Sequence, residues 1–377
     1  MINSYKIIVS NSAINELKVR LSHTRWPDKE RVDDWSQGIP LHYVQEVVDY
    51  WLHNYDHHRL AKRLNQWSNF CTEINGVDIH FIHVRSSSIG AKPLILTHGW
   101  PGSVIEFLKV IEPLTEPQAF GGCVSDAFHL VIPSLSGYGF SGRPEVNGWG
   151  IEKIADCWAE LKKRLGYPRY LAQGGDWGSL VTAALARQDI AHCRGIHLNM
   201  VAVPPDKDSL DLTDQEKAAL VSLQFYQDWD SGYSKIQATR PQTLGFALAD
   251  SPGGQAAWIL EKFFAWTDCG GHPENVLSRD ELLDNIMVYW LNGAGASSAR
   301  LYWHSFGRID SNTHSVSQPM GASIFPKEII RTSRCVAERV YTNIVHWNEL
   351  DRGGRFAAFE CPMVFAEEIR NCFRMVT

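Results

Sequence analysis

The sequence predicts an α/β fold in which a mostly parallel sheet is covered by helices on both faces. Two observations favour it. From about residue 77 to about residue 200, short apolar runs alternate with helical patterns, which is typical of parallel sheets. Within that region, residues 169–186 show an apolar strand, a tight glycine-rich turn and a helical face at Val181, Ala184 and Leu185. Ligands of such sheets bind beyond the carboxyl ends of the strands, so this turn is a candidate site.

The turn itself is Gly174-Gly175-Asp176-Trp177-Gly178, a G-x-D-x-G pattern. A strand, a sharp turn and a helix in this order are the context of a nucleophile elbow, in which a reactive side chain is exposed at the turn. Asp176 holds the nucleophile position, and a carboxylate there would attack carbon and form an ester with the enzyme. The structural alternative is that Asp176 only caps the helix, because Asp is favoured at helix starts.

Residues 1–75 are predicted to form a lead-in domain with helical faces at residues 11–21 and 41–51. A charged segment between these helices carries Trp26 and Trp35, and we expect it to wrap around the main domain. Next, Asn75-Gly76 separates two alternating runs, which predicts a hairpin.

The first part of the core is assigned to residues 76–202 and the second part to residues 321–377. Between them, residues 203–320 lack the strand–helix alternation and are predicted to form a helical cap over the strand ends. The expected strands of the core are 93–97, 129–133, 170–172, 195–199, 322–325 and 340–346, and its expected helices are 104–114, 151–165 and 356–376. The expected cap helices are 214–226, 252–266 and 279–291.

Composition excludes several classes of function. The 377-residue chain has a net charge of −6 and no run of Lys and Arg, so nothing indicates binding to nucleic acid or to an anionic membrane surface. Its eight cysteines are scattered without a C-x-x-C pair, which predicts free thiols in a reducing compartment. No signal peptide and no apolar run of about 18 residues is visible, so a cytoplasmic location is expected.

Several long motifs make the chain resemble the epoxide hydrolases of the microsomal type, in their soluble branch. These are TRWPD and DDWSQG in the lead-in, followed by HGWPGS, PSLSGYGFS, GGDWGS, SGYSKIQATRP, DSPGGQAAWILEKFFAWTD, SSARLYW, FPKE and RGGRFAAFE. The resemblance covers nearly the whole chain. It implies an α/β-hydrolase fold with a helical cap and an N-terminal wrapping segment.

The resemblance also implies a two-step reaction that gives a vicinal diol. Asp176 would open the epoxide, and the phenols of Tyr233 and Tyr302 would supply the proton to the epoxide oxygen. Glu328 falls at the position of the acid that assists a catalytic histidine. Backbone N–H groups of Trp100 and Trp177 would stabilise the oxyanion formed when water attacks the ester. His98 is interpreted as a structural residue of the oxyanion loop. For each tyrosine the alternative is core packing.

One position departs from the family's pattern. Where the family has the histidine that activates water, in RGGRFAAFE, this chain has Arg355, and an arginine does not give up its proton at working pH. Four readings remain: His304 or His346 replaces the base, or the chain is a variant with slow turnover. In the third, the epoxide opens without an ester, by rearrangement or cyclisation as in natural-product biosynthesis. The fourth, a binder without catalysis, gives no reason for Asp176, Glu328 and the tyrosines to occur together.

A haloalkane dehalogenase is an alternative, because such enzymes share the fold and the Asp nucleophile, but the tyrosine pair favours an epoxide. The 14 tryptophans and 12 tyrosines favour a bulky apolar or aromatic epoxide as the small-molecule partner. Neither a metal ion nor an organic cofactor is expected, because side chains supply both the nucleophile and the proton donors. A homodimer is one assembly that the sequence allows.

Overall fold

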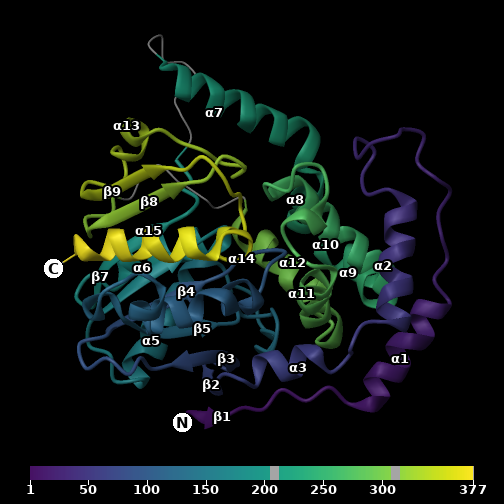
Figure 1. Ribbon diagram of the computed structural model, residues 1–377, viewed down its shortest axis with the longest axis horizontal. Helices are drawn as coiled ribbons and strands as arrows, with labels where there is room; N and C mark the ends of the chain where they lie inside the picture. Colours follow the sequence, from purple (N-terminus) through teal and green to yellow (C-terminus); the bar gives the residue numbers. More distant parts are fainter. Residues whose placement is uncertain (204–211, 307–314, 377) are drawn as a thin grey trace.

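The computed structural model describes residues 1–203, 212–306 and 315–376, and within them nine strands form one sheet (Figure 1). The strand order is β1-β2-β3-β5-β4-β6-β7-β8-β9. The first four strands in this order pair antiparallel, and the six from β5 to β9 are parallel. The strands are β1 Asn3–Ser4, β2 Asn69–Ile74, β3 Val77–Val84, β4 Lys92–Thr97, β5 Phe128–Pro133, β6 Tyr170–Gly174, β7 Cys193–Leu198, β8 Met320–Ile324 and β9 Ile344–Glu349.

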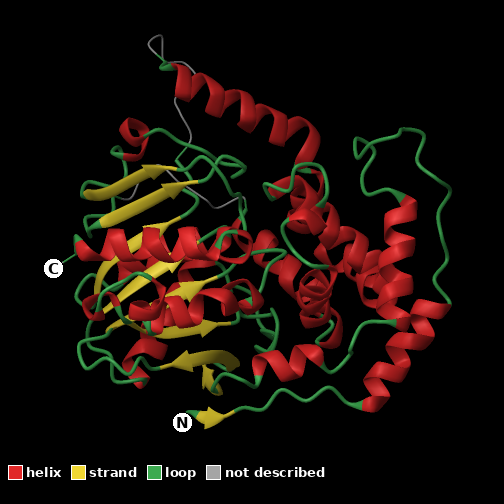
Figure 2. Cartoon of the chain, in the orientation of Figure 1, coloured by secondary structure: helices red, strands yellow, loops and turns green. Residues whose placement is uncertain are grey.

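Two groups of helices flank the sheet, and a third group lies beside its strand ends (Figure 2). In the first group, α5 Ile151–Arg164 packs on α6 Trp177–Gln188. The second group is built around the short helix η1 Val104–Val110, which contacts α4 Ile111–Thr115, α14 Ala357–Glu360 and α15 Pro362–Arg374. The mostly parallel sheet covered by helices is therefore confirmed. A short helix, α13 Arg334–Ala337, precedes β9, and further 3₁₀ turns are η2 Pro117–Phe120, η3 Val124–Asp126 and η5 Pro273–Asn275.

The third group lies between β7 and β8 along the chain and includes helices that periodicity did not predict. Its members are α7 Asp214–Phe225, the π-helical turn η4 Tyr226–Asp230, α8 Gly232–Thr239, α9 Pro241–Asp250, α10 Pro252–Trp266, α11 Arg279–Leu291 and α12 Ala294–Ser305. Residues 204–211 and 307–314, at the two ends of the expected cap, lie outside the described part. The lead-in contributes α1 Asn11–Ser22, α2 Leu41–His53 and α3 Arg59–Leu64, and α1 and α2 contact α10 (Figure 1).

Three predicted elements differ from the structure. Residues 104–114 form a 3₁₀ helix that passes into the short α4. The last strand begins at Ile344, because residues 337–341 form hydrogen-bonded turns. The predicted C-terminal helix is broken at Pro362, which has no N–H to continue a helix and therefore starts a new one. The hairpin at Asn75-Gly76 is confirmed, since Ile74 pairs with Val77 across two residues of positive φ.

The elbow between β6 and α6 depends on two glycines. A Cβ on Gly174 would lie 2.0 Å from the carbonyl oxygen of Gly178, and a Cβ on Gly178 would lie 2.0 Å from that of Thr97. The turn therefore packs backbone against backbone. Asp176 itself has φ 54° and ψ −131°, a conformation that costs a non-glycine residue about 1–3 kcal/mol. The local fold is built to hold this side chain at the strand end.

Replacing Gly178 by Ala is expected to destabilise the protein by at least about 1–3 kcal/mol, because the backbone at Thr97 must move to admit the methyl group. The matched control is Gly175→Ala, whose Cβ would meet its nearest neighbour, Asn199, at 3.6 Å. Urea unfolding of both variants measures the difference. Equal midpoints for the two variants would contradict this account of the elbow.

Lys162 on α5 is fully buried in the core, and its Nζ has no hydrogen-bond partner among the described residues. The ammonium lies 4.4 Å from the ring centroid of Tyr167 and 5.4 Å from that of Tyr170, so aromatic faces are its neighbours. Burial lowers the pKa of Lys162 to about 7. The unfolded chain, where the pKa of a lysine is about 10.4, therefore binds more protons than the folded chain between these two values.

Stability should accordingly rise with pH from about pH 7 to about pH 10 through this group. Lys162→Met is expected to raise the unfolding temperature at pH 7, where the buried charge is costly, and to raise it less near pH 10. Thermal unfolding across this range tests the expectation. Lys163→Met, at the exposed neighbouring position, is the control and should show no such pH-dependent gain.

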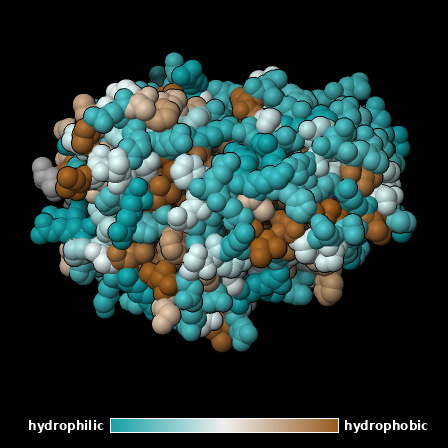
Figure 3. Space-filling view, turned by 60° about the horizontal axis from the view of Figure 1, so that its bottom comes forward, coloured by the Kyte–Doolittle hydropathy of each residue, from teal (hydrophilic) through white to brown (hydrophobic). Residues whose placement is uncertain are grey.

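No helix in the described ranges is long and apolar enough to cross a membrane. The face shown in Figure 3 is mostly hydrophilic, with hydrophobic side chains in separate patches.

Candidate active site

The site residues follow the carboxyl ends of the parallel strands. Trp100 follows β4, Asp176 follows β6, Glu328 follows β8, and Arg355 lies in the loop after β9. Because parallel strands end at one edge of the sheet, these four residues from distant parts of the chain meet there. Tyr233 and Tyr302 come from α8 and α12.

The Asp176 carboxylate does not cap α6, since its side chain makes no capping hydrogen bond. Instead, its Oδ1 accepts a hydrogen bond of 2.8 Å from the backbone N–H of Trp100. A Cβ on Gly99 would lie 1.9 Å from the same oxygen, so the loop can approach the carboxylate only with glycine at that position. Because the side chain makes no capping hydrogen bond, the alternative in which Asp176 only caps α6 is wrong. Trp177 is the first residue of α6, where N–H groups have no acceptor within the helix.

Arg355 joins the two acids of the site. Its Nη2 donates to Asp176 Oδ2 and its Nη1 donates to Glu328 Oε1, both as short ion pairs. The exposed fractions of the three side chains are 4% for Arg355, 9% for Asp176 and 1% for Glu328. Burial raises the pKa of Glu328 and lowers the pKa of Arg355. Each group therefore depends on the opposite charge beside it to remain ionised.

The two tyrosines lie against the tryptophans of the predicted oxyanion hole. The Tyr233 ring stacks on Trp100 with centroids 4.8 Å apart, and the edge of Tyr302 meets Trp177 at 4.7 Å. The tyrosine rings are 5.9 Å apart. Burial raises the pKa of both phenols well above 10, so both keep their protons at neutral pH. The structure thus brings together all seven residues that the sequence singled out.

A cavity of about 1020 Å³ leads to this site. Tyr233 and Glu328 line it, together with α10, the loop after β8 and residues 34–38 of the lead-in. Trp35 of the lead-in stacks on Phe264 of α10 with ring centroids 3.9 Å apart, which fixes this part of the wall. Aromatic side chains make up much of the lining: Trp35, Phe225, Tyr226, Trp229, Trp258, Phe264 and Trp266.

In the described structure the hydrogen bonds of the Asp176 carboxylate join it to Trp100 and Arg355, and none joins it to the proposed bases His304 and His346 or to His98. His98 is buried between two backbone groups: its Nδ1 bonds the carbonyl of Gly99 at 3.0 Å and its Nε2 accepts from the N–H of Leu135 at 3.2 Å. Burial lowers its pKa to about 4. His304 Nδ1 accepts from the N–H of Gly148 at 3.3 Å. His346 binds Glu368 on α15 at 2.8 Å.

Three residues near the site were not predicted from the sequence. The hydroxyl of Tyr226, in the π-helical turn, lies 3.2 Å from that of Tyr233. The Trp266 ring lies 5.0 Å from the guanidinium carbon of Arg355, and its carbonyl accepts from the Arg355 N–H at 2.9 Å. Glu106 is buried, and burial raises its pKa to about 8. Trp266 lies in one of the motifs given above and Glu106 in the predicted helix 104–114, but nothing in the sequence shows that these segments meet Arg355.

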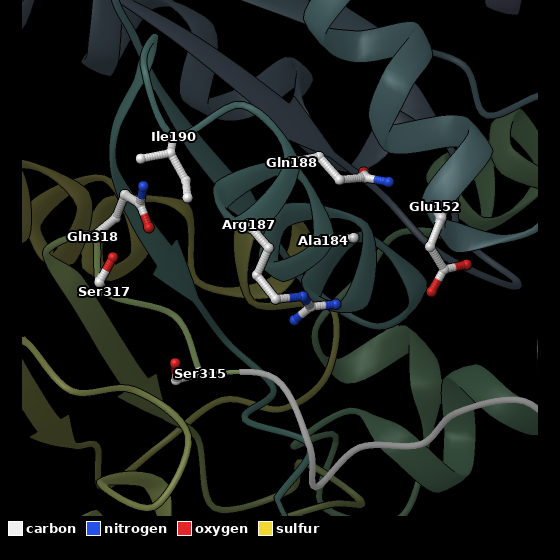
Figure 4. Close-up of a pocket in the computed structure, with 8 residues that line it drawn as sticks. All are labelled: Glu152, Ala184, Arg187, Gln188, Ile190, Ser315, Ser317 and Gln318. Atoms are coloured by element: carbon white, nitrogen blue, oxygen red, sulfur yellow. The ribbon is translucent and has the colours of Figure 1, made fainter.

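A second hollow, of about 490 Å³, lies at the other end of α6 (Figure 4). It is lined by Ala184, Arg187 and Gln188 near the end of α6, whereas Asp176 precedes its first turn. At about 1.5 Å per residue, the length of α6 separates the two sites. In the described ranges, no group of three or more His, Cys, Asp or Glu side chains is arranged to hold a metal ion.

Two family models match the chain. "Epoxide hydrolase N terminus" matches residues 2–107, and "alpha/beta hydrolase fold" matches residues 92–233. The "Putative epoxide hydrolase" of Stigmatella aurantiaca is 52% identical over 100% of this chain and 85% of its own length. "Epoxide hydrolase 1" of Oryctolagus cuniculus is 35% identical over 98% of this chain and 88% of its own length.

Solved structures agree with the sequence matches. Juvenile hormone epoxide hydrolase from the silkworm Bombyx mori superimposes with a TM-score of 0.91 at 30% identity, covering 99% of this chain and 94% of that one. The epoxide hydrolase of Aspergillus niger gives a TM-score of 0.90 at 29% identity, with 100% and 97% covered. The chain is an enzyme of the epoxide hydrolase family, with the α/β-hydrolase fold and the family's N-terminal domain.

Proposed function

We propose that this enzyme hydrolyses a bulky apolar or aromatic epoxide to a vicinal diol, with Asp176 as the nucleophile. The observation that carries the proposal is the placement of the Asp176 carboxylate. The carboxylate lies at a strained elbow, and one of its oxygens accepts a hydrogen bond from the Trp100 N–H. Two protonated phenols, Tyr233 on α8 and Tyr302 on α12, belong to the same site. The aromatic lining of the cavity supports the substrate class.

In the first step a carboxylate oxygen of Asp176 forms a bond to an epoxide carbon, and the carbon–oxygen bond of the ring breaks. Tyr233 or Tyr302 gives its proton to the oxygen that leaves that carbon. The product is an ester of Asp176 that carries a free hydroxyl group. The second step, attack of water on this ester, needs a proton acceptor, and Arg355 cannot serve as one.

A second function has a specific observation in its favour. Both oxygens of Asp176 are hydrogen-bonded, one to Trp100 and one to Arg355. A carboxylate held in this way can also accept a proton from a hydroxyl group or from water that attacks the epoxide directly. The epoxide would then open by rearrangement, cyclisation or direct hydration, without an ester.

Heavy-oxygen water separates the two functions. With enzyme in excess over styrene oxide, the ester route places an oxygen of Asp176 in the first diol and the heavy oxygen in Asp176, because water attacks the acyl carbon. Mass spectrometry of the diol and of the peptide containing Asp176 measures both, with Asp176→Asn as the control. Heavy oxygen in the first diol and none in Asp176 would favour direct opening.

The tyrosines have a separate test. Tyr233→Phe and Tyr302→Phe are each expected to slow ester formation by about 10²-fold or more, because the epoxide oxygen loses a proton donor. Stopped-flow measurement of single turnover reports this step. Tyr138→Phe is the matched control, since the Tyr138 hydroxyl is also buried but has no hydrogen-bond partner among the described residues. An equal loss of rate in all three variants would argue for packing rather than proton donation.

Cytoplasmic location and a homodimer remain predictions from the sequence.

A further inference from the structure

The ester of Asp176 requires a base for its hydrolysis, and Glu328 is the acid that Arg355 joins to Asp176. Its carboxylate is almost fully buried yet lines the large cavity that reaches Tyr233. The two oxygens differ in their surroundings. Oε1 receives the Arg355 guanidinium and the N–H of Ile329 at 2.8 Å. Oε2 has no hydrogen-bond partner in the described part of the chain.

Arg355 likewise has paired and unpaired atoms, but they are donors. Its Nη1 and Nη2 bind Glu328 and Asp176, whereas its Nε is buried without a hydrogen-bond partner among the described residues. A buried donor or acceptor that stays unpaired costs about 1–3 kcal/mol. Water can accept a hydrogen bond from Nε and donate one to Oε2, so water bound at these atoms would satisfy them. The ion pair thus offers one free donor and one free acceptor, and its guanidinium contacts the nucleophile through Nη2.

We propose that Glu328, and not the residue at position 355, is the general base that activates water against the Asp176 ester, with Arg355 orienting that water. This inference rests on the proposed function. It assigns the proton acceptor that the replacement of the histidine left open. Arg355 then acts through position and charge and never needs to lose a proton.

The step balances without a further reactant. Water forms a bond to the acyl carbon of Asp176 and gives one proton to Glu328, and the Trp100 N–H binds the oxygen that becomes negative. The bond between the acyl carbon and the ester oxygen then breaks, and the departing alkoxide takes the proton from Glu328. The Asp176 carboxyl group returns its own proton to the phenolate left by the first step. All groups are restored and the diol is released.

The electrostatics of the pair suit this role. Burial raises the pKa of Glu328, and a carboxylate of higher pKa is a stronger base. Glu360 and Tyr226 interact with Glu328, whereas Asp176 and Glu106 act on its partner Arg355. Once Asp176 is esterified its negative charge is gone, and Arg355 is then left to pair with Glu328 and hold it ionised.

Glu106 supplies the matched control, because burial raises its pKa as well. Its carboxylate is packed against Gly102: a Cβ on that glycine would lie 1.4 Å from Glu106 Oε1. Glu106 therefore resembles Glu328 in burial and in the direction of its pKa shift, and it also acts on the charge of Arg355, but in the described part of the chain no salt bridge joins it to Arg355.

The test compares single turnover of styrene oxide by the wild type, Glu328→Gln and Glu106→Gln, following the alkylated enzyme by intact mass. Glu328→Gln should form the ester, and its hydrolysis should be slower than in the wild type by about 10²–10⁴-fold. Glu106→Gln should hydrolyse its ester at least ten times faster than Glu328→Gln. Ester hydrolysis at the wild-type rate in Glu328→Gln, or an equal block in Glu106→Gln, would overturn the inference.

Two further measurements cover a variant that fails to fold or to react. In the wild type, the rate of ester hydrolysis should rise with pH as Glu328 loses its proton and should level off once Glu328 is ionised, and Glu328→Asp should keep that dependence at a lower rate. A flat profile would overturn the inference. If the wild type forms no ester and its first diol carries heavy oxygen from water, the proposed function itself fails, which the labelling shows separately.

Discussion

The active site depends on one buried cation. Without Arg355, Asp176 and Glu328 would bring two negative charges into a space almost closed to water, where a charge is costly unless it is paired. With Arg355, the three groups carry a net charge of −1. In the proposed reaction the Asp176 charge is lost on esterification, and Arg355 and Glu328 remain as a neutral pair beside the phenolate left by the first step. Arg355 therefore stabilises the free carboxylate more than the ester, and it keeps the Glu328 charge paired in both states, whichever group later activates water.

The backbone supplies the other half of this arrangement. Gly174 and Gly178 let the elbow close on itself, and Gly99 lets the loop after β4 reach the carboxylate. The resulting contact from the Trp100 N–H to Asp176 ties together the ends of two neighbouring strands, β4 and β6. In the proposed reaction the donor that holds the resting carboxylate would also bind the oxyanion, so this step would need no reorganisation of the loop.

Much of this could be predicted from the sequence, and the parts that could be are local. Asp176 and its glycines lie within five residues, and strand–turn–helix patterns are readable at that range. Periodicity missed α8 and α12, although Tyr233 and Tyr302 on them could be found through their motifs. The pairing of Arg355 with Asp176 joins residues 179 positions apart, and the contact of Trp266 with Arg355 crosses from the cap to the core. Such contacts arise from packing, for which a single sequence has no local signal.

The tryptophans around Asp176 give the site an optical property of its own. Trp100 and Trp177 contact the two phenols, and Trp266 lies over the guanidinium of Arg355. Indole emission responds to nearby charge and to the polarity of its surroundings, and all three rings border the atoms whose charge changes when an ester forms. The chain therefore carries a built-in fluorophore set that can report the chemical state of Asp176 in real time, without a label or a chromogenic substrate.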